Sequence, residues 1–484
     1  MSTIIGREKE KKELEKLYNS RYPEFVAVYG RRRVGKTFLI SEYFNNSFSF
    51  SHSGLSPIEM NDTPNSKLQM QLNSFYNSLV KYGLKKTKTP QNWLDAFLLL
   101  EELLESKKED RLLVFLGEIQ WFDTPKSYFT TALESFWNGW ASKKNIMLIV
   151  CGSSTSWIMN KLINNHGGLY DRITYQIELS PFTLKECKDY LNSMNIRMSN
   201  YDIVQSYMAV GGIPYYLHYF DEELSFPKNI DNLFFDKKAK LKDEYDRMFS
   251  SVFSNPEQMK RLVKCLFTKK VGLTRKELLD KLNIQSSGQI TEQLEALISS
   301  DIIIKYYSFG ESKREQLYKI VDPFCLFYLN FVDNNKNNSV SYFESIYNSS
   351  KANSWKGVAF ENVCFNHIDQ IKDALKISGV SSYETLWAKK GNEEEIGTQI
   401  DLILDRADNV IDLCEVKFYN DLYSLNKDDY LKIERRKNII SSMVPKRKII
   451  HSILITSYGL KKNEYSNAFV KTITIDDLFR WLSL

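Results

Sequence analysis

Short apolar runs alternate with amphipathic stretches along the first 180 residues, which is the pattern of an α/β domain. The run FVAVYG at residues 25–30 predicts a buried strand, and a helix-like stretch, FLISEYF, follows it after a glycine-containing loop. Two more apolar runs, at residues 112–116 and 145–153, end in small or acidic residues. The pattern therefore predicts an α/β core whose strand ends carry polar side chains.

The second half of the chain shows two further patterns. Residues 255–330 predict a helix, a turn, a second helix and a hairpin, which is the order of a winged helix. Residues 355–456 predict a helix, two strands joined by a polar turn, a charged helix and a last strand. A chain of 484 residues is too long for one core, so three or four domains are expected.

Composition narrows the class of protein only mildly. With 43% hydrophobic and 26% charged residues the chain resembles an ordinary soluble protein. The 65 Lys and Arg against 60 Asp and Glu permit a nucleic-acid partner without requiring one. The six cysteines are scattered, with no C-x-x-C pair, and predict reduced core thiols. The start lacks the apolar region of a signal peptide and no apolar run approaches the ~20 residues of a membrane helix, so we expect a cytoplasmic protein without membrane contact.

Residues 30–37, GRRRVGKT, match G-x-x-x-x-G-K-T between a strand and a helix, which is the context of a phosphate-binding loop. Gly30 and Gly35 let the backbone N–H groups face phosphates. Lys36 is expected to reach the β- and γ-phosphates and the Thr37 hydroxyl to bind Mg²⁺, whereas a chance glycine loop is the alternative. We therefore expect ATP and Mg²⁺ as cofactors, held by Gly30, Arg31, Arg32, Arg33, Val34, Gly35, Lys36, Thr37 and Phe38.

The strand at residues 112–116 ends in Gly117 and Glu118, where a nucleotide-hydrolysing site has Asp followed by Glu. Glu118 is the candidate general base that activates water. Glycine supplies no carboxylate to the shell around Mg²⁺, so we expect ATP binding to persist and hydrolysis to be weakened. The loss is about 100-fold if the missing group contributes a few kcal/mol to the transition state. Asp123 replaces it only if the following turn folds back, and a natural ATP-gated switch and a sequence altered to trap ATP both explain the glycine.

The ordered segments GREKE, YGRRRVGKTFLI, VFLGEIQW, CGSSTSWI, GGLYDR, LSPFTLKE and VGGIPYYL resemble an archaeal and bacterial family of P-loop ATPases related to the STAND and AAA+ groups. The resemblance covers roughly the first half of the chain, and the family has Asp at position 117. It implies that the segment with Arg7 lies across the adenine, that Ser153 senses the γ-phosphate, and that Arg172 is in an arginine-finger-like position. It also implies that Pro214 lies in a turn of a helical lid near the base. From the residues alone, Ser153 also fits a serine-rich turn and Arg172 a structural role.

The segment from 255 to 320 carries more Lys and Arg than Asp and Glu; the basic residues include Lys269, Lys270, Arg275, Lys276, Lys313 and Arg314. Duplex DNA binding by its second helix and its hairpin is one interpretation. A packing module between domains is the other, because that helix presents serine, glutamine, threonine and glutamate rather than arginine. Two capping boxes, beginning at Thr183 and Thr274, predict helix starts in this region and before it.

A third constellation lies on the two predicted strands within residues 398–419. Asp401 stands on the first strand, and Glu415 and Lys417 stand two apart on the second, so the latter two point to one face. Paired carboxylates bind one or two Mg²⁺ ions for phosphodiester hydrolysis, and a lysine positions the water or neutralises charge. The pattern resembles the PD-(D/E)xK restriction-endonuclease-like superfamily, which implies a further carboxylate ligand at Glu361. Gln399 shares the face of Asp401, and the alternative is an inherited fold in which Lys417 forms only a structural salt bridge.

Together these patterns predict an α/β, P-loop AAA+-like ATPase core over residues 1–180, a helical lid over 181–250, a winged-helix domain over 251–340 and a PD-(D/E)xK nuclease-like domain over 341–484. The expected function is an ATPase coupled to a metal-dependent nuclease that acts on nucleic acid, DNA in preference to RNA. Its catalytic residues would be Glu118, Arg172, Asp401, Glu415 and Lys417. An arginine finger that acts across subunits is compatible with a homo-oligomer. A nucleotide-gated scaffold without catalysis and a DNA-reading regulator are the alternatives.

Overall fold

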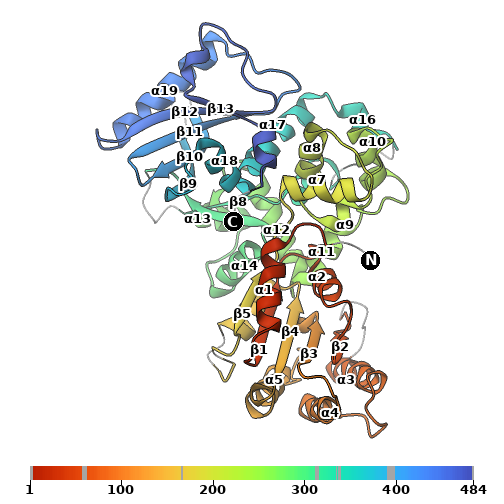
Figure 1. The fold of residues 1–484 in the computed structure, drawn as a ribbon. Helices are drawn as coiled ribbons and strands as arrows, with labels where there is room; N and C mark the ends of the chain where they lie inside the picture. The colour runs from red at the N-terminus through yellow and green to blue at the C-terminus, as the bar shows by residue number, and fades with distance from the viewer. Residues whose placement is uncertain are drawn as a thin grey trace. The chain divides into compact units, whose positions relative to one another are not determined.

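The computed structural model describes residues 4–56, 63–164, 167–169, 171–310, 316–333, 335, 340–389 and 398–481. Within it the chain forms two compact units (Figure 1). Unit 1 comprises Met1–Pro181 and Asp246–Pro256, and unit 2 comprises Phe182–Tyr245 and Glu257–Leu484. The four domain boundaries predicted from the sequence remain a prediction.

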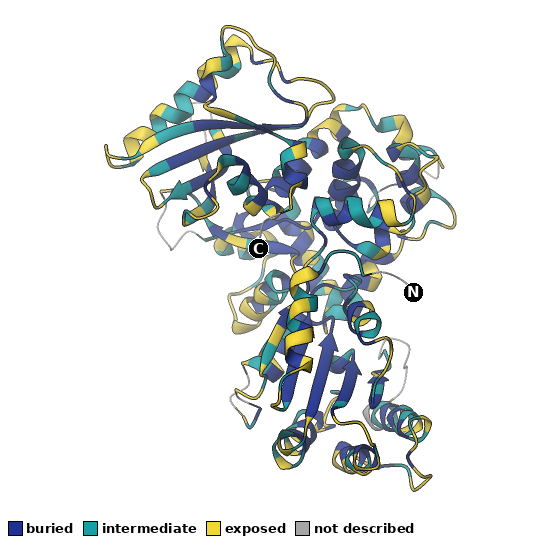
Figure 2. Cartoon of the chain, in the orientation of Figure 1, coloured by how far each residue is buried: buried dark blue, intermediate teal, exposed yellow. Residues whose placement is uncertain are grey.

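Unit 1 is built on a five-stranded parallel sheet with the strand order β2-β3-β4-β1-β5. Its two central strands, β1 and β4, are buried at every position because both faces of the sheet are covered (Figure 2). The three predicted strands are confirmed, whereas β2 and β5 were not predicted. The strands are β1 (Glu24–Tyr29), β2 (Phe50–Ser53), β3 (Leu112–Gly117), β4 (Ile146–Gly152) and β5 (Tyr175–Glu178).

Helices cover this sheet and enclose an aromatic core. Trp93 packs edge-on against Phe75, Phe122 and Phe129, with ring centroids 5.1–5.4 Å apart. Such pairs add to the free energy that area burial alone supplies. The elements are α1 (Glu8–Tyr18), α2 (Lys36–Tyr43), α3 (Pro64–Lys81), α4 (Trp93–Glu105), η2 (Ile119–Trp121), α5 (Phe129–Gly139), η3 (Ala141–Lys143), α6 (Thr155–Ile158), η4 (Met159–Ile163) and α11 (Glu244–Val252), most of which belongs to unit 1.

The first part of unit 2 is helical. Thr183 and Thr274 form capping boxes with Glu186 and Glu277, which confirms both predicted helix starts. The helices before residue 256 are α7 (Leu184–Ser193), α8 (Asn200–Val210), α9 (Pro214–Leu217), α10 (Phe226–Ile230) and η5 (Asp231–Phe235). Further helices that pack around them are α15 (Pro323–Phe331), α16 (Tyr342–Ile346), α17 (Ser350–Asn366) and α18 (Ile368–Leu375).

Residues 256–320 follow the predicted order of helix, turn, helix and hairpin. A three-stranded antiparallel sheet in the order β6-β8-β7 accompanies the helices. The elements are α12 (Pro256–Phe267), β6 (Leu273–Thr274), α13 (Arg275–Leu282), α14 (Gly288–Ile298), β7 (Ile303–Tyr307) and β8 (Gln316–Ile320). Lys313 and Arg314, predicted as basic residues of the wing, lie outside the described residues, and the winged-helix assignment remains a prediction.

The last part of unit 2 contains a mixed five-stranded sheet in the order β13-β12-β11-β10-β9. The three strands from β9 to β11 pair antiparallel, and β11, β12 and β13 pair parallel. The strands are β9 (Ser382–Lys389), β10 (Thr398–Arg406), β11 (Val410–Lys417), β12 (Ile449–Thr456) and β13 (Lys471–Thr474), with α19 (Lys427–Met443), η6 (Ser466–Ala468) and η7 (Ile475–Phe479). The predicted order is present, although α18 and β9 were not predicted, and the nuclease-like assignment remains a prediction.

Two predictions about the whole chain concern cysteines and membranes. All six cysteines lie buried as thiols, as expected of core residues. In the part of the chain that the structure describes, every helix is too short or too polar to traverse a lipid bilayer.

Candidate functional site

The loop between β1 and α2 has the backbone of a phosphate-binding loop. Gly30 and Gly35 have φ values of 137° and 94°, and Arg33 between them has a φ of 69°. A Cβ atom on Gly30 would collide with the carbonyl oxygen of Leu179, so only glycine lets these two segments approach. Because α2 begins at Lys36, its unpaired N–H groups and positive end face the loop.

Lys36 is buried beneath this loop. Its Nζ donates hydrogen bonds to the carbonyl oxygens of Gly30 and Arg31, each at 2.8 Å. Burial lowers the pKa of the Lys36 ammonium, while the neighbouring Cys151 and Glu118 oppose that shift. Thr37 is exposed, and its side chain hydrogen-bonds to the Cys151 thiol at the end of β4. The predicted phosphate-binding lysine and Mg²⁺-binding hydroxyl therefore lie beside the ends of β3 and β4.

Glu118 and Ser153 meet at the carboxyl ends of adjacent parallel strands. Ser153 is buried, and its Oγ donates a 2.8 Å hydrogen bond to Glu118 Oε2. Gln120 Nε2 donates to the same oxygen at 2.6 Å. The candidate base and the candidate sensor are thus in direct contact. Gln120 was missed by the sequence reasoning, and its position two residues after Glu118 was the signal that could have found it.

Gly117 lies opposite Ser53 at the ends of β3 and β2. A Cβ atom on Gly117 would overlap the Ser53 hydroxyl oxygen. Asp123, the other carboxylate considered for this role, accepts a 3.0 Å hydrogen bond at its Oδ2 from Trp157 Nε1. Ser53 was also missed, since the short strand FSHS has no hydrophobic alternation that distinguishes it.

The arginines predicted near the nucleotide contact the protein itself. Arg7 Nη2 donates to the carbonyl oxygens of Ser180 and Val34, at 2.7 and 3.5 Å. Arg32 Nη1 donates to the carbonyl oxygen of Arg247 at 2.9 Å. Arg31 Nη2 lies 3.5 Å from Met248 Sδ. Residues 246–256, remote in the sequence, therefore pack against the phosphate-binding loop within unit 1, a contact that no local sequence pattern predicts.

The other predicted nucleotide-site residues are distributed more widely. Arg172 is exposed in a turn whose Arg172 N–H donates to the Leu169 carbonyl at 3.1 Å. Val34 is buried, Arg33 is half-buried and Phe38 is exposed. Pro214 is the first residue of α9 in unit 2. Tyr170 of the GGLYDR segment lies outside the described residues.

The residues singled out near the C-terminus line one cavity of about 460 Å³ in unit 2. Asp401, Gln399, Glu415 and Lys417 reach it from β10 and β11, and Glu361 reaches it from α17. Leu402 pairs with Cys414 in the antiparallel register, which sets Asp401 opposite Glu415. The structure therefore brings together all five residues.

Burial, together with a neighbouring carboxylate, raises the pKa of two acidic side chains in this cavity. Burial and the neighbouring Glu415 raise the pKa of Asp401 to about 6, although Val416 N–H donates to its Oδ2 at 3.1 Å. Burial and the neighbouring Asp401 raise the pKa of Glu361 to about 7. Carboxylates crowded in a buried site are typical of a site that receives a cation.

Cations surround the carboxylates. Lys417 Nζ lies 2.7 Å from Glu415 Oε1, and Arg436 of α19 forms an ion pair with the other oxygen of Glu415. Lys319 of β8 is buried and lies 3.8 Å from Glu361 Oε2. Neither ion pair was predicted from the sequence, because Arg436 and Lys319 are each distant from their partner along the chain.

The fit to a metal ion rests on two carboxylates. Asp401 and Glu415 have the oxygen chemistry that Mg²⁺ prefers. Among the residues that the structure describes, no group of three or more His, Cys, Asp or Glu side chains is arranged to hold a metal ion. Glu361 lines the same cavity and pairs with Lys319 at 3.8 Å, whereas Asp401 and Glu415 lie opposite each other on adjacent strands, so these two are the candidate ligand set.

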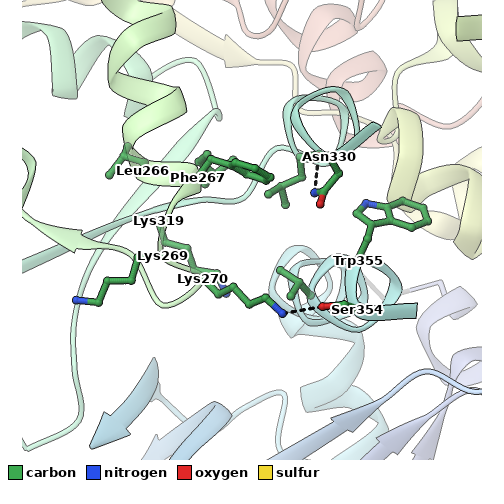
Figure 3. Close-up of a pocket in the computed structure, with 11 residues that line it drawn as sticks. Leu266, Phe267, Lys269, Lys270, Lys319, Asn330, Ser354 and Trp355 are labelled. Carbon is green, nitrogen blue, oxygen red and sulfur yellow. Dashed lines mark hydrogen bonds between the residues drawn. The ribbon is translucent and has the colours of Figure 1, made fainter. Parts of the chain in front are cut away.

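A smaller cavity of about 100 Å³ lies near the ends of α12 and β8 (Figure 3). Lys270 points to Ser354 of α17 and donates a 3.0 Å hydrogen bond to its Oγ. Lys269 pairs with Glu277 at 2.8 Å. Lys269 thus pairs within the segment 255–320, whereas Lys270 contacts α17 outside it, as the packing interpretation of this segment expects.

Comparison with known proteins supports the first of the two sites. Residues 4–220 match a family described as an ATPase domain predominantly from Archaea. This range contains the phosphate-binding loop, the ends of β3 and β4, and helices α7 to α9. This part of the chain is therefore similar to an ATPase domain, and the loop at residues 30–37 is its candidate nucleotide-binding site.

The chain is similar to one further protein in sequence and to two solved structures in fold. An uncharacterized protein of Methanocaldococcus jannaschii is 24% identical over 460 residues, which cover 89% of this chain and 94% of that protein. A Walker-type ATPase of Pyrococcus abyssi is 20% identical with a TM-score of 0.46, over 68% of this chain and 96% of that chain. The ORC2 protein of Aeropyrum pernix, in its ADPNP and ADP complexes, is 12% identical with a TM-score of 0.43, over 70% of this chain and 94% of that chain.

Proposed function

We propose that this protein is an ATPase whose second unit carries a metal-dependent nuclease site and that its substrate is DNA. The observation that carries the proposal is the convergence of Asp401, Glu415 and Lys417 in one cavity. These residue types on two adjacent strands, with a carboxylate from a neighbouring helix, fit phosphodiester hydrolysis better than they fit a structural salt bridge. The raised pKa of Asp401 supports this, because a purely structural ion pair would hold a carboxylate ionised.

In the nuclease site Asp401 and Glu415 would hold a divalent cation, which polarises a phosphodiester when it is bound. Lys417 extends from the same face of β11 and would position the attacking water or neutralise charge that develops on the phosphate. Gln399 Nε2 donates to Asp401 Oδ1 at 3.3 Å and would fix the orientation of that carboxylate. Arg436 and Lys417 would release Glu415 in part when the cation arrives.

In the ATPase site Lys36 would exchange its two carbonyl acceptors for phosphate oxygens as ATP enters. Thr37 would supply a hydroxyl ligand to Mg²⁺, and Glu118, held by Ser153 and Gln120, would orient the attacking water. Gly117 offers no carboxylate, so turnover would be slow and bound ATP would act as a switch. Arg172 is exposed, as an arginine finger in a homo-oligomer needs to be.

The test is cleavage of labelled DNA by the full chain with ATP and Mg²⁺ or Mn²⁺. We expect cleavage by the wild type and its loss in Asp401→Asn, Glu415→Gln and Lys417→Met. Asp405→Asn is the matched control, because Asp405 lies on the same strand but pairs with Lys448. Intact DNA and RNA after incubation, together with no metal binding by a folded protein, would refute the proposal.

A nucleotide-gated binding protein without nuclease activity is the second candidate. It is favoured by the double pairing of Glu415 with Lys417 and Arg436, which neutralises this carboxylate without a metal. Under this candidate the same three substitutions leave nucleic-acid or protein binding unchanged. Their effect on binding and cleavage, measured side by side, separates the two.

A further inference from the structure

Lys356 of α17 is a buried cation in the wall of the 460 Å³ cavity. Its Nζ donates a 3.1 Å hydrogen bond to the Tyr347 carbonyl and lies 3.6 Å from the centroid of the Tyr347 ring. Burial alone lowers its pKa to about 8. Among the described residues no carboxylate forms an ion pair with it. The roles proposed for Asp401, Glu415 and Lys417 in the nuclease site do not involve Lys356.

The other cations of the cavity have partners of opposite charge. Lys417 and Arg436 both pair with Glu415. The Tyr347 ring and carbonyl offset part of the cost of burying the Lys356 ammonium, and a phosphate in the cavity would supply the negative charge that its surroundings lack. The Tyr347 carbonyl, just after α16, takes one of the three N–H donors of Lys356 and explains its direction. Lys356 itself is one of the residues that line the cavity.

The size and lining of the cavity restrict that ligand. A volume of about 460 Å³ falls within the ~300–1,000 Å³ of ligand pockets, which suits one stretch of a single strand rather than a duplex. The ring of Tyr201 stacks on Phe418 and on Tyr458, with centroids 4.8 and 5.4 Å apart, so this wall is rigid. Amide side chains of Asn348, Asn353 and Asn420 complete the lining.

We propose that the cavity receives a single nucleic-acid strand and that Lys356 binds a backbone phosphate other than the one that faces Asp401 and Glu415. This inference rests on the proposed function and names its substrate class. The phosphodiester that reacts would lie beside Asp401, Glu415 and Lys417. Lys356 would contact the strand at a different phosphate. Phosphate contacts of this kind set the register of a strand without reading its sequence.

The test measures binding of a labelled single-stranded oligodeoxynucleotide and of its duplex to the full chain in EDTA, at a series of NaCl concentrations. One phosphate contact contributes ~0.7 to the slope of log K against log salt for a single strand. We expect Lys356→Gln to lower that slope by ~0.7 and to leave the duplex slope unchanged. Lys351→Gln is the control, since Lys351 is exposed on the same helix and lies over the Phe331 ring. An unchanged single-strand slope in Lys356→Gln, or no strand binding by the wild type, overturns the inference.

A second measurement needs no variant. Binding of the wild type is measured for a set of strands, each of which has an uncharged methylphosphonate at one linkage. We expect weaker binding when the modified linkage is a particular one other than the linkage that is cleaved. Lys356→Arg keeps the charge and should keep the slope. A wild type that cleaves DNA while Lys356→Gln retains its slope overturns only this inference. A lowered slope without cleavage in any metal overturns only the proposed nuclease.

Discussion

Ser53 and Gly117 face each other at the ends of β2 and β3, and the Ser53 hydroxyl oxygen lies only 2.4 Å from the position that a Cβ atom of residue 117 would take. The missing carboxylate at position 117 therefore concerns two residues, Gly117 and the neighbouring Ser53. The neighbouring strand has filled the space next to Gly117 with a small polar side chain. A carboxylate at position 117 requires this hydroxyl to move or to be absent.

We expect Ser53→Ala/Gly117→Asp to hydrolyse ATP about 100-fold faster than the wild type. Gly117→Asp alone should gain less, because Ser53 obstructs the new side chain. Ser53→Ala alone is the control and should leave turnover unchanged. ATP turnover, with nucleotide binding measured for all four proteins, gives the answer, and equal rates in the single and double variants would show that Ser53 does not obstruct.

Ser153→Ala removes one of the two donors that hold the Glu118 carboxylate. A hydrogen bond to a charged group contributes ~1.5–3 kcal/mol, so we expect turnover to fall by about tenfold or more while ATP binding persists. Ser154→Ala is the neighbouring control, because its Oγ bonds to the Val252 carbonyl instead. Equal losses in both variants would assign Ser153 to the fold rather than to hydrolysis.

The sequence predicted the parts of the ATPase site that are continuous in the chain. The phosphate-binding loop and the ends of β3 and β4 were predicted because each is an apolar run followed directly by characteristic residues. A pattern of this kind is contained in a short stretch of sequence. Ser53, Gln120 and the segment 246–256 were not predicted. Their contacts depend on strand order and on chain return, which local patterns do not encode.

His367 makes the stability of unit 2 depend on pH. Its Nε2 accepts a 2.9 Å hydrogen bond from Leu184 N–H, so Nδ1 carries the proton and donates to the Val363 carbonyl at 2.8 Å. Burial lowers the pKa of His367 from 6.5 to about 4. The unfolded chain then takes up a proton between these values while the folded chain does not. The stabilisation is complete above about pH 6.5 and is lost as the pH falls toward about 4.

We expect the unfolding free energy of the full chain to fall by up to about 3 kcal/mol across that window because of His367. Urea titration at pH values inside and above it measures the change. His367→Gln should reduce the dependence on pH, and His218→Gln, at an exposed histidine, should keep it. A wild-type slope in His367→Gln would show that this ring does not titrate in the window.

Arg436 competes with a cation for Glu415. Arg436→Met should therefore tighten Mn²⁺ binding by about tenfold, which corresponds to ~1.4 kcal/mol. Calorimetric titration with Mn²⁺ measures the affinity. Lys432→Met removes a charge from the exposed face of the same helix and should have little effect. Weaker binding in Arg436→Met would mean that Arg436 places Glu415 for the metal.

The site at Asp401 and Glu415 was also predicted only where its residues are close together in the sequence. Asp401, Glu415 and Lys417 lie on two strands joined by a short turn, so the sequence alone placed them on adjacent antiparallel strands. Arg436, Lys319 and Lys356 come from α19, β8 and α17 and meet the site only through tertiary packing. A lysine in a helix pattern is ordinarily a solvated residue, and nothing in the sequence marks Lys356 as buried.

The proposed effect of ATP on DNA cleavage is tested by the cleavage rate with ATP, with ADP and without nucleotide. It is measured for the wild type and for Lys36→Ala, which lacks the phosphate-binding lysine. We expect ATP to change the wild-type rate several-fold relative to ADP, and we expect Lys36→Ala to have one rate in all three conditions. A wild-type rate that is the same in all three conditions would contradict the coupling of the ATPase domain to the site at Asp401 and Glu415.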